Sequence, residues 1–352
     1  MRLPRSIETA DVAGKRVLVR ADLNVPLEDG RVADDTRIRA AVPTLQLLLA
    51  RGAADVAVCS HLGRPKTDED RAKYAMTPVA ARLRELVPDE RVHVLDNTRF
   101  NPGETSNDEG YARELAAGRD LYVNDAFGSA HRAHSSTEAV AHLLPAYAGL
   151  LLLDELAHLG KLLGDVERPF VLVAGGAKVD DKLGVLQHLG DRADTVLVGG
   201  KMAEQLRDEN PLSFPVELPV DVVAAASFAA DAETRVTSYD AVPEGWLGLD
   251  IGPETRERFG AIVRGAKTVF WNGPMGVFEW PSFAAGTTAV AEAVADVDGY
   301  TVVGGGDSVR AVQEAGLADR ISWISTGGGA SLELLEGGEL LGVAVIPTEV
   351  AV

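Results

Sequence analysis

Basic side chains gather on a loop of very small residues in the segment NDAFGSAHRAHSS, at positions 124–136. Its alanine, glycine and serine residues cover little surface, so His131, Arg132 and His134 stay accessible to a ligand. A guanidinium group binds carboxylate and phosphate in a bidentate manner. The segment therefore indicates a site for a small anion, in which the two histidines either contact the ligand or only orient Arg132.

The same kind of residue follows other apolar runs in residues 1–150. Runs such as RVLVRADLNVP and DVAVCSHLGRP are continuously apolar before they turn polar, which predicts strands buried on both faces. In a parallel sheet the carboxyl ends of the strands meet at one edge, where ligands bind. We therefore expect one patch for a small, doubly anionic ligand. Its members share a position at a strand end or, for Arg37, at a helix start: Arg20, Asp22, Asn24, Arg37, His61, Arg64, Arg99 and Arg132.

Glycine clusters follow the apolar runs of the second half. They lie at 175–176, 199–200, 304–306 and 327–329, and the last two precede predicted helices. A single glycine turn is often only tight-turn geometry. Exposed amides at the positive end of a helix, however, form a site for phosphate oxygens. Neither GxxxxGK[ST] nor GxGxxG is present, which excludes a Walker loop and the standard dinucleotide fingerprint.

Three charged residues accompany these turns. Asp307 either caps a helix or holds Mg²⁺ beside a polyphosphate, because Mg²⁺ prefers carboxylate and phosphate oxygens. Lys178 and Lys182 are four residues apart, and we expect them on one face of a helix. Lysines are usually solvated at the surface, but after a glycine turn they are also placed to bind phosphate.

Repeated strand–turn–helix units must position these residues, which predicts an α/β fold with doubly wound parallel sheets. A length of 352 residues favours two domains. The helical period of 152–169 predicts a connecting helix closed by Gly164 and Pro169. The net charge of −19 comes almost entirely from residues 151–352 and disfavours nucleic-acid binding.

Location in the cytoplasm is the expectation from three features. The longest apolar run, 143–153, is too short to cross a bilayer. The N-terminus lacks the apolar region of a secretory signal. The single cysteine, Cys59, suits a reducing compartment.

Nine motifs occur in an order that resembles the phosphoglycerate kinase family. AHRAHSS and WNGPMGVFE are the most specific. The full set, almost end to end, is RVLVRADLNVPL, SHLGRP, LDNTRFNPGE, YVNDAFGSAHRAHSS, GGAKVDDK, LDIGPET, WNGPMGVFE, GGGDS and STGGGASLELLEG.

The resemblance implies two Rossmann-like domains that face a cleft and close by hinge bending, in a monomeric enzyme. It implies a phosphoglycerate-binding domain at 1–151, an interdomain helix at 152–167, a Mg-nucleotide-binding domain at 168–336 and a C-terminal segment, 337–352, that returns to the first domain. The substrates would be 1,3-bisphosphoglycerate and ADP, or 3-phosphoglycerate and ATP, with Mg²⁺ as cofactor.

The resemblance also implies roles for individual residues. The phosphoglycerate site would comprise Asp22, Leu23, Asn24, Arg37, His61, Leu62, Gly63, Arg64, Arg99 and Arg132. The nucleotide site would comprise Gly176, Lys178, Lys182, Gly200, Pro274, Val277, Glu279, Gly305, Gly306, Asp307 and Ser308, with Asp307 as the metal ligand. The residues expected to act on the transferred phosphoryl group are Arg37, Lys178, Gly305 and Gly328.

Two departures from the family pattern lie on the expected adenine side. The stretch from Met202 to Leu218 is shorter than is usual, and Lys201 replaces a glycine. Glu254 stands where lysine is common. A dehydrogenase is disfavoured because GxGxxG is absent. A non-catalytic relative is disfavoured because Arg37, Lys178 and Asp307 are all present.

Overall fold

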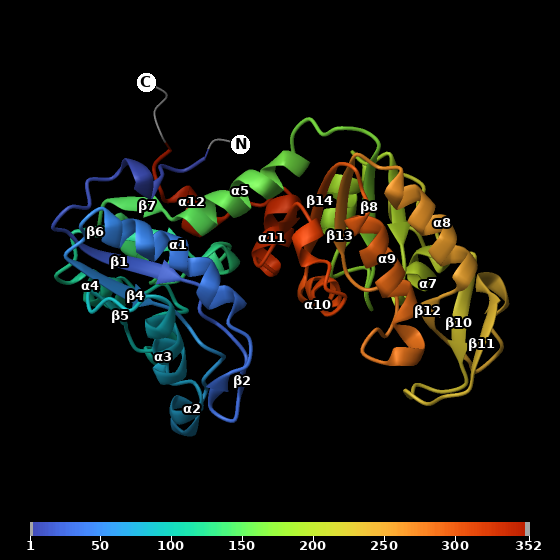
Figure 1. Cartoon of the computed structure of the whole chain (residues 1–352), viewed down its shortest axis with the longest axis horizontal. Coiled ribbons are helices and arrows are strands. Elements are labelled where there is room, and N and C mark those ends of the chain that lie inside the picture. The colour runs from blue at the N-terminus through green and yellow to red at the C-terminus, as the bar shows by residue number, and fades with distance from the viewer. Residues whose placement is uncertain (1–2, 349–352) are drawn as a thin grey trace. The chain divides into compact units, whose positions relative to one another are not determined.

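Two compact units make up the protein, whose computed structural model describes residues 3–348. Of the described residues, the first unit holds 3–157 and 339–348, and the second holds 158–338. The chain passes from one to the other within helix α5, Leu150–Leu162 (Figure 1). The α/β class with two parallel sheets that the sequence predicts is confirmed.

A five-stranded sheet in the order β5-β4-β1-β6-β7 forms the centre of the first unit, with every neighbouring pair parallel. Of the five strands, β1, β4 and β6 are buried on both faces, as their continuous apolar runs predict, whereas β5 is half-buried. Their bounds are β1 Arg16–Ala21, β4 Asp55–Cys59, β5 Val92–Val94, β6 Leu121–Asp125 and β7 Ala146–Ala148. A short hairpin of β2 (Leu27–Glu28) and β3 (Arg31–Val32) lies apart from this sheet.

Helices of the first unit cover the sheet through an apolar core that includes Val17, Leu45 and Val58, all fully buried. The helices are α1 Thr36–Ala50, α2 Asp68–Lys73, α3 Thr77–Leu86, α4 Glu109–Ala116 and α12 Leu341–Ala344. Helix α12 belongs to this unit although it lies near the end of the chain (Figure 1). Asn124 donates to the carbonyl of Gly342 at 2.9 Å, and the Gly342 N–H donates to the carbonyl of Ala130 at 2.8 Å.

A second parallel sheet, in the order β15-β14-β13-β8-β9, forms the centre of the second unit. Its strands are β8 Phe170–Ala174, β9 Thr195–Val198, β13 Thr268–Asn272, β14 Tyr300–Gly304 and β15 Trp323–Ile324. Its helices are α6 Leu183–Gly190, α7 Lys201–Asp208, α8 Pro253–Arg264, α9 Ala285–Ala295, α10 Gly306–Glu314 and α11 Gly329–Leu335. Helices α8, α9 and α10 run side by side (Figure 1), and Phe259, Trp271 and Val290 are buried in the core beneath them.

A three-stranded antiparallel sheet of the second unit is absent from the sequence-based expectation. Its order is β11-β10-β12, with β10 Asp221–Ala225, β11 Thr234–Ser238 and β12 Leu247–Ile251. Most residues of β11 are exposed, so this strand has none of the continuous apolar character on which the other strands were predicted. Within residues 3–348, no helix has the length and apolar character needed to cross a membrane.

Candidate active site

Polar residues cluster at the carboxyl ends of the strands in the first unit. The buried guanidinium of Arg20, at the end of β1, lies at the centre of this cluster. It donates to Ser136 Oγ at 2.8 Å and to His61 Nδ1 at 3.0 Å. Ser136 in turn donates to the buried carboxylate of Glu104 at 2.6 Å, so a buried anion lies one hydroxyl group away from the buried cation. This network fixes the imidazole of His61, two residues after the end of β4.

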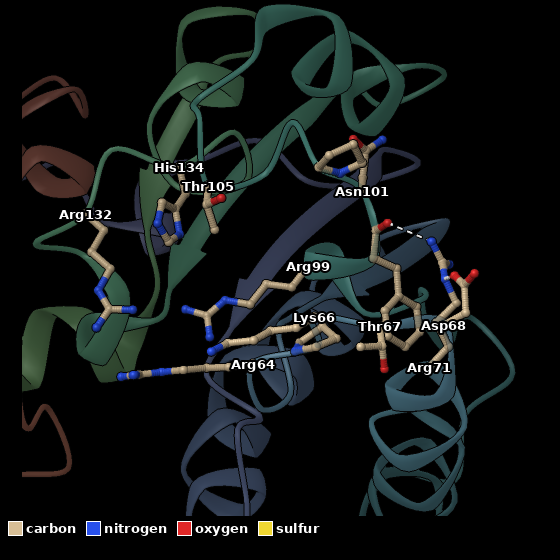
Figure 2. A pocket seen from close by; sticks show the side chains of 13 residues that line it. Arg64, Lys66, Thr67, Asp68, Arg71, Arg99, Asn101, Thr105, Arg132 and His134 are labelled. Atoms are coloured by element: carbon tan, nitrogen blue, oxygen red, sulfur yellow. Dashed lines mark hydrogen bonds and ion pairs between the residues drawn. The ribbon is translucent and has the colours of Figure 1, made fainter.

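A cavity of about 920 Å³ reaches this network at His134, which lines the cavity and lies 3.9 Å from the Glu104 carboxylate. The side chains of Arg64, Arg99 and Arg132 point toward the same open space, and Lys66 adds a further cation (Figure 2). Arg132 donates through Nε to His131 Nε2 at 3.0 Å, which fixes the direction of its guanidinium. Three guanidinium groups facing one space provide a site for a ligand with more than one negative charge.

Gly63 joins this basic cavity to the polar end of β1. Its carbonyl accepts from Arg99 Nη1 at 2.6 Å, and its N–H donates to Asn24 Oδ1 at 2.8 Å. The position requires glycine, because its φ is +62° and an added Cβ would lie 2.2 Å from the ring of Tyr74. The loop that carries His61 is therefore held against the arginines by its own backbone.

Arg37, in the first turn of α1, lies on the opposite side of Asn24. Its Nη1 donates to the carbonyl of Asn24 at 3.2 Å and to the carboxylate of Asp22 at 3.3 Å. Its side chain is 35% exposed, whereas that of Asp22 is 7% exposed. Arg37 is thus held through one terminal nitrogen, Nη1, and its guanidinium retains other donors for a ligand.

Burial and neighbouring guanidinium groups keep His61 and His134 neutral. Burial, with Arg20 next, holds the pKa of His61 well below its usual value. Because Nδ1 of neutral His61 accepts from Arg20, its proton lies on Nε2, which makes Nε2 a donor for a ligand. Burial likewise lowers the pKa of His134 to about 4, although Glu104 opposes the shift. The 3.9 Å contact between His134 and Glu104 is therefore not an ion pair at neutral pH.

The sequence missed several residues that hold this site together. Asn97 is buried and donates through Nδ2 to the carbonyls of Leu62 at 2.7 Å and Tyr74 at 3.0 Å. Leu62 itself is buried, so it supports the loop from inside the core. Glu104 and Asn97 both lie in the motif LDNTRFNPGE, but only their fully buried positions reveal these roles.

Glycine turns of the second unit also follow the carboxyl ends of parallel strands, and backbone bonds join three of them. The N–H of Gly200, after β9, donates to the carbonyl of Met275 at 3.0 Å, and the Met202 N–H donates to that of Gly176 at 3.1 Å. A Cβ at Gly175 would lie 2.1 Å from the carbonyl oxygen of Pro274, so only glycine permits this approach. The loops after β8, β9 and β13 thus form one surface.

Lys182 extends across Gly273 within this surface. Its Nζ donates to the carbonyl of Asn272 at 2.8 Å, and an added Cβ at Gly273 would lie 2.2 Å from Nζ. Burial lowers the pKa of Lys182 to about 8, while Asp307 and Asp181 act in the opposite direction. Lys182 is therefore a partly desolvated cation directed at the turns, and an anionic ligand would restore its ordinary pKa.

The expectation that Lys178 and Lys182 share a helical face is wrong. Helix α6 begins only at Leu183, and the residues before it form a loop. The backbone N–H of Val179 donates to the side-chain oxygen of Gln205 at 2.8 Å instead of entering a helix. Lys178 is exposed on this loop, beside the surface that Lys182 crosses.

Asp307 is not a helix cap. The N-cap of α10 is Gly305, whose φ of +86° favours glycine, and Gly306 and Asp307 lie in the first turn. Ser308 is fully buried and accepts the N–H of Gly273 at 2.5 Å, so it holds the turns after β13 and β14 together. The Asp307 carboxylate remains exposed at the positive end of the helix.

The remaining predicted nucleotide residues lie next to this helix end. The Val277 N–H donates to the carbonyl of Leu249 at 2.8 Å, which attaches the loop after Pro274 to β12. Glu279 is exposed, and together with Asp307 it adds to the effect of Glu314 in raising the pKa of Arg310. The turn at 327–329 follows β15 next to β14, with Gly328 as the N-cap of α11 at a φ of +52°.

A family model described as phosphoglycerate kinase matches residues 7–214 and 206–338. The phosphoglycerate kinases of Roseiflexus sp. (strain RS-1) and Rubrobacter xylanophilus are each 50% identical to this chain, over 391 and 386 residues, covering 97% of this chain and 98% of each relative.

Solved structures give the same result. That of phosphoglycerate kinase from Coxiella burnetii has a TM-score of 0.86 and 34% sequence identity to this chain, and that from Pyrococcus horikoshii OT3 has 0.82 and 29%. Each comparison covers 97% of this chain and 98% of the solved chain. The sequence alignments with the two relatives are longer than the 352 residues of this chain, so those relatives contain segments that it lacks.

Proposed function

The chain belongs to the phosphoglycerate kinase family, and we propose how its own residues carry out the reaction of that family. The reaction is the reversible transfer of a phosphoryl group between 1,3-bisphosphoglycerate and ADP, which yields 3-phosphoglycerate and ATP in glycolysis and, in reverse, in gluconeogenesis. The observation that carries the proposal is the separation of the two surfaces: arginines meet at the strand ends of one unit and glycine amides at those of the other.

The phosphoglycerate binds in the basic cavity of the first unit. Arg64, Arg99 and Arg132 hold its phosphate and carboxylate charges, supported by their shared direction in Figure 2. Neutral His61 donates from Nε2 to a ligand oxygen. Asp22, Leu23, Asn24, Leu62 and Gly63 form the adjoining wall and keep Arg37 in place.

The nucleotide binds at the glycine turns of the second unit. Amides of Gly305 and Gly306 at the positive end of α10, together with Lys178 and Lys182, receive the phosphates. Ser308 holds the turn after β13 against the turn after β14 through its bond from the Gly273 N–H. The remaining contacts come from Gly176 and Gly200 on the joined loops and from Pro274, Val277 and Glu279 at the nucleoside.

Asp307 is proposed to hold Mg²⁺ together with the nucleotide phosphates. No cluster of three or more histidine, cysteine or acidic residues suited to a metal ion occurs within residues 3–348. A single exposed carboxylate nevertheless fits Mg²⁺, which usually keeps several waters and binds through one or two carboxylates and the substrate phosphates. The ion would neutralise phosphate charge and orient the nucleotide.

The transfer needs positioning and charge stabilisation rather than an acid or base. When the acyl phosphate loses its phosphoryl group, the leaving group is already a carboxylate, so no proton must move. Arg37 stabilises the negative charge on the phosphoryl group during its transfer. Lys178 and the amides of Gly305 and Gly328 stabilise the same charge from the nucleotide side. Hinge bending that brings the two ligands together is part of the same proposal, as are a monomeric state and a cytoplasmic location.

A coupled assay tests the proposal. Purified protein, ATP, Mg²⁺ and 3-phosphoglycerate are expected to release ADP, and omission of 3-phosphoglycerate is expected to abolish the release. ADP release that does not depend on 3-phosphoglycerate would assign the protein a different phosphotransfer or hydrolysis reaction.

A further inference from the structure

A cavity of about 390 Å³ lies in the second unit between α7 and the antiparallel sheet. Lys201 and Glu204 line it from α7, and Tyr239, Trp246 and Gly248 from the other side. The two segments of the chain that match the family model overlap at residues 206–214, directly after this part of α7. The match to the family model is therefore interrupted next to this cavity.

The cavity adjoins the residues proposed to hold the nucleoside. Gly200 directly precedes Lys201 and is bonded to Met275. Leu249 directly follows Gly248 and accepts the N–H of Val277. A nucleoside held at the loop after Pro274 thus has this cavity next to it, and the volume lies within the usual range of ligand pockets.

We infer that this cavity receives the base of the nucleotide and that the Lys201–Glu204 pair selects guanine at least as well as adenine. The inference rests on the proposed function and specifies its nucleotide substrate. Lys201 and Glu204 are bonded to each other, one turn apart on α7, with side chains 57% and 23% exposed. An ammonium group and a carboxylate therefore lie side by side at the wall of the cavity.

The hydrogen-bonding edges of the two bases decide the selection. Guanine presents the O6 acceptor next to two donors, N1–H and the N2 amino group. O6 accepts from an ammonium group, while a carboxylate accepts from both donors at once. Adenine presents a single amino donor next to the N1 acceptor, so the same pair makes one fewer bond. Tyr239 adds a buried hydroxyl that has no hydrogen-bond partner within residues 3–348.

Steady-state kinetics with ATP and with GTP test the inference in the intact protein. We measure phosphorylation of 3-phosphoglycerate at fixed Mg²⁺ and salt, and compare the ratio of kcat/KM for GTP to that for ATP. A ratio of about 1 or more is expected for the unchanged protein. Glu204→Gln replaces one acceptor oxygen by a donor and is expected to lower the ratio at least about tenfold.

Two further variants provide a second test and a control. Lys201→Gly removes the donor to O6 and is expected to lower the ratio as well. Glu209→Gln alters an exposed carboxylate just after the end of the same helix, outside the cavity, and is expected to leave the ratio unchanged. Far-ultraviolet circular dichroism establishes that each variant is folded.

Three results would overturn the inference. A preference of the unchanged protein for ATP of more than about threefold overturns the inference and leaves the kinase function intact. A ratio of kcat/KM for GTP to that for ATP that is the same in Glu204→Gln, Lys201→Gly and the unchanged protein also overturns the inference. Absence of transfer with either nucleotide overturns the proposed function itself, and the inference with it.

Discussion

Asn97 is the residue whose loss we expect to damage the first unit most selectively. Its side chain is 2% exposed and makes three bonds: Nδ2 donates to Leu62 and Tyr74, and Oδ1 accepts the N–H of Arg99 at 3.1 Å. A typical hydrogen bond contributes about 0.5–1.5 kcal/mol net, and an unsatisfied buried partner costs about 1–3 kcal/mol. Since two of the three partners, Tyr74 and Arg99, are only partly buried, Asn97→Ala is expected to lower the free energy of unfolding by about 2–4 kcal/mol.

Urea unfolding followed by two probes measures this effect. All four tryptophans lie in the second unit, at Trp246, Trp271, Trp280 and Trp323, so tryptophan fluorescence reports on that unit. Circular dichroism reports on both units. With a slope of about 2 kcal/mol per molar urea, the dichroism transition of the first unit is expected to move down by about 1–2 M. The fluorescence transition is expected to stay in place, and the KM for 3-phosphoglycerate to rise because Arg99 and the loop at Leu62 lose their anchor.

Asn101→Ala is the matched control. Asn101 lines the basic cavity of the first unit and accepts the N–H of Gly103 at 2.9 Å, but its side chain is only partly buried. Its loss is expected to shift the dichroism transition by less than about 0.5 M. If Asn97→Ala behaves like this control, or if fluorescence shifts as much as dichroism, the assigned anchoring role of Asn97 is refuted.

Arg37→Ala is expected to lower kcat by up to roughly 10³-fold with little change in KM, because its charge is used in the transition state. Arg99→Ala or Arg132→Ala is expected to raise KM instead, and steady-state kinetics of the three variants at one salt concentration distinguish the two effects. A change in KM alone for Arg37→Ala contradicts its catalytic role. Asp307→Asn is expected to weaken Mg-nucleotide far more than metal-free nucleotide in calorimetry, and equal weakening would remove its role as a metal ligand. Lys182 has a pKa of about 8, so it is protonated below that pH and loses its charge above it. Nucleotide affinity is therefore expected to fall about tenfold between pH 7 and pH 9. Lys182→Arg is expected to abolish this dependence of affinity on pH. A slope that persists in Lys182→Arg assigns the titration to another group.

Most strands were predictable because their signal is local. Continuous apolar runs ending in polar residues marked β1, β4, β5 and β6 in the first unit and all five strands of the second parallel sheet. Strand β7 was missed because Ala146–Ala148 is only three residues long and lies within the apolar run 143–153. Strand β11 was missed because four of the five residues in Thr234–Ser238 are exposed, so that its sequence resembles a polar loop.

The site was predictable only where strand ends carry it. Strand ends placed Arg99 and Arg132 near one another without knowledge of the fold. The link from Arg20 through Ser136 to Glu104 joins residues more than a hundred and more than thirty positions apart, and no local spacing encodes it. The loop around Lys178 was wrongly predicted to be helical because Lys178 and Lys182 are four residues apart, a spacing typical of a helix. Its backbone conformation is instead set by a long-range hydrogen bond from the Val179 N–H to the side chain of Gln205.

The central claim is that phosphoglycerate binds to the arginine cavity of the first unit and the nucleotide to the glycine turns of the second. Hydrogen exchange of the intact protein, read by mass spectrometry with one ligand at a time, tests it directly. 3-Phosphoglycerate is expected to protect peptides that cover 22–37, 61–66, 97–105 and 126–136, and MgADP those that cover 175–182, 199–204, 272–279 and 304–308. Protection of the arginine loops by MgADP alone, with the glycine turns unchanged, would contradict the account.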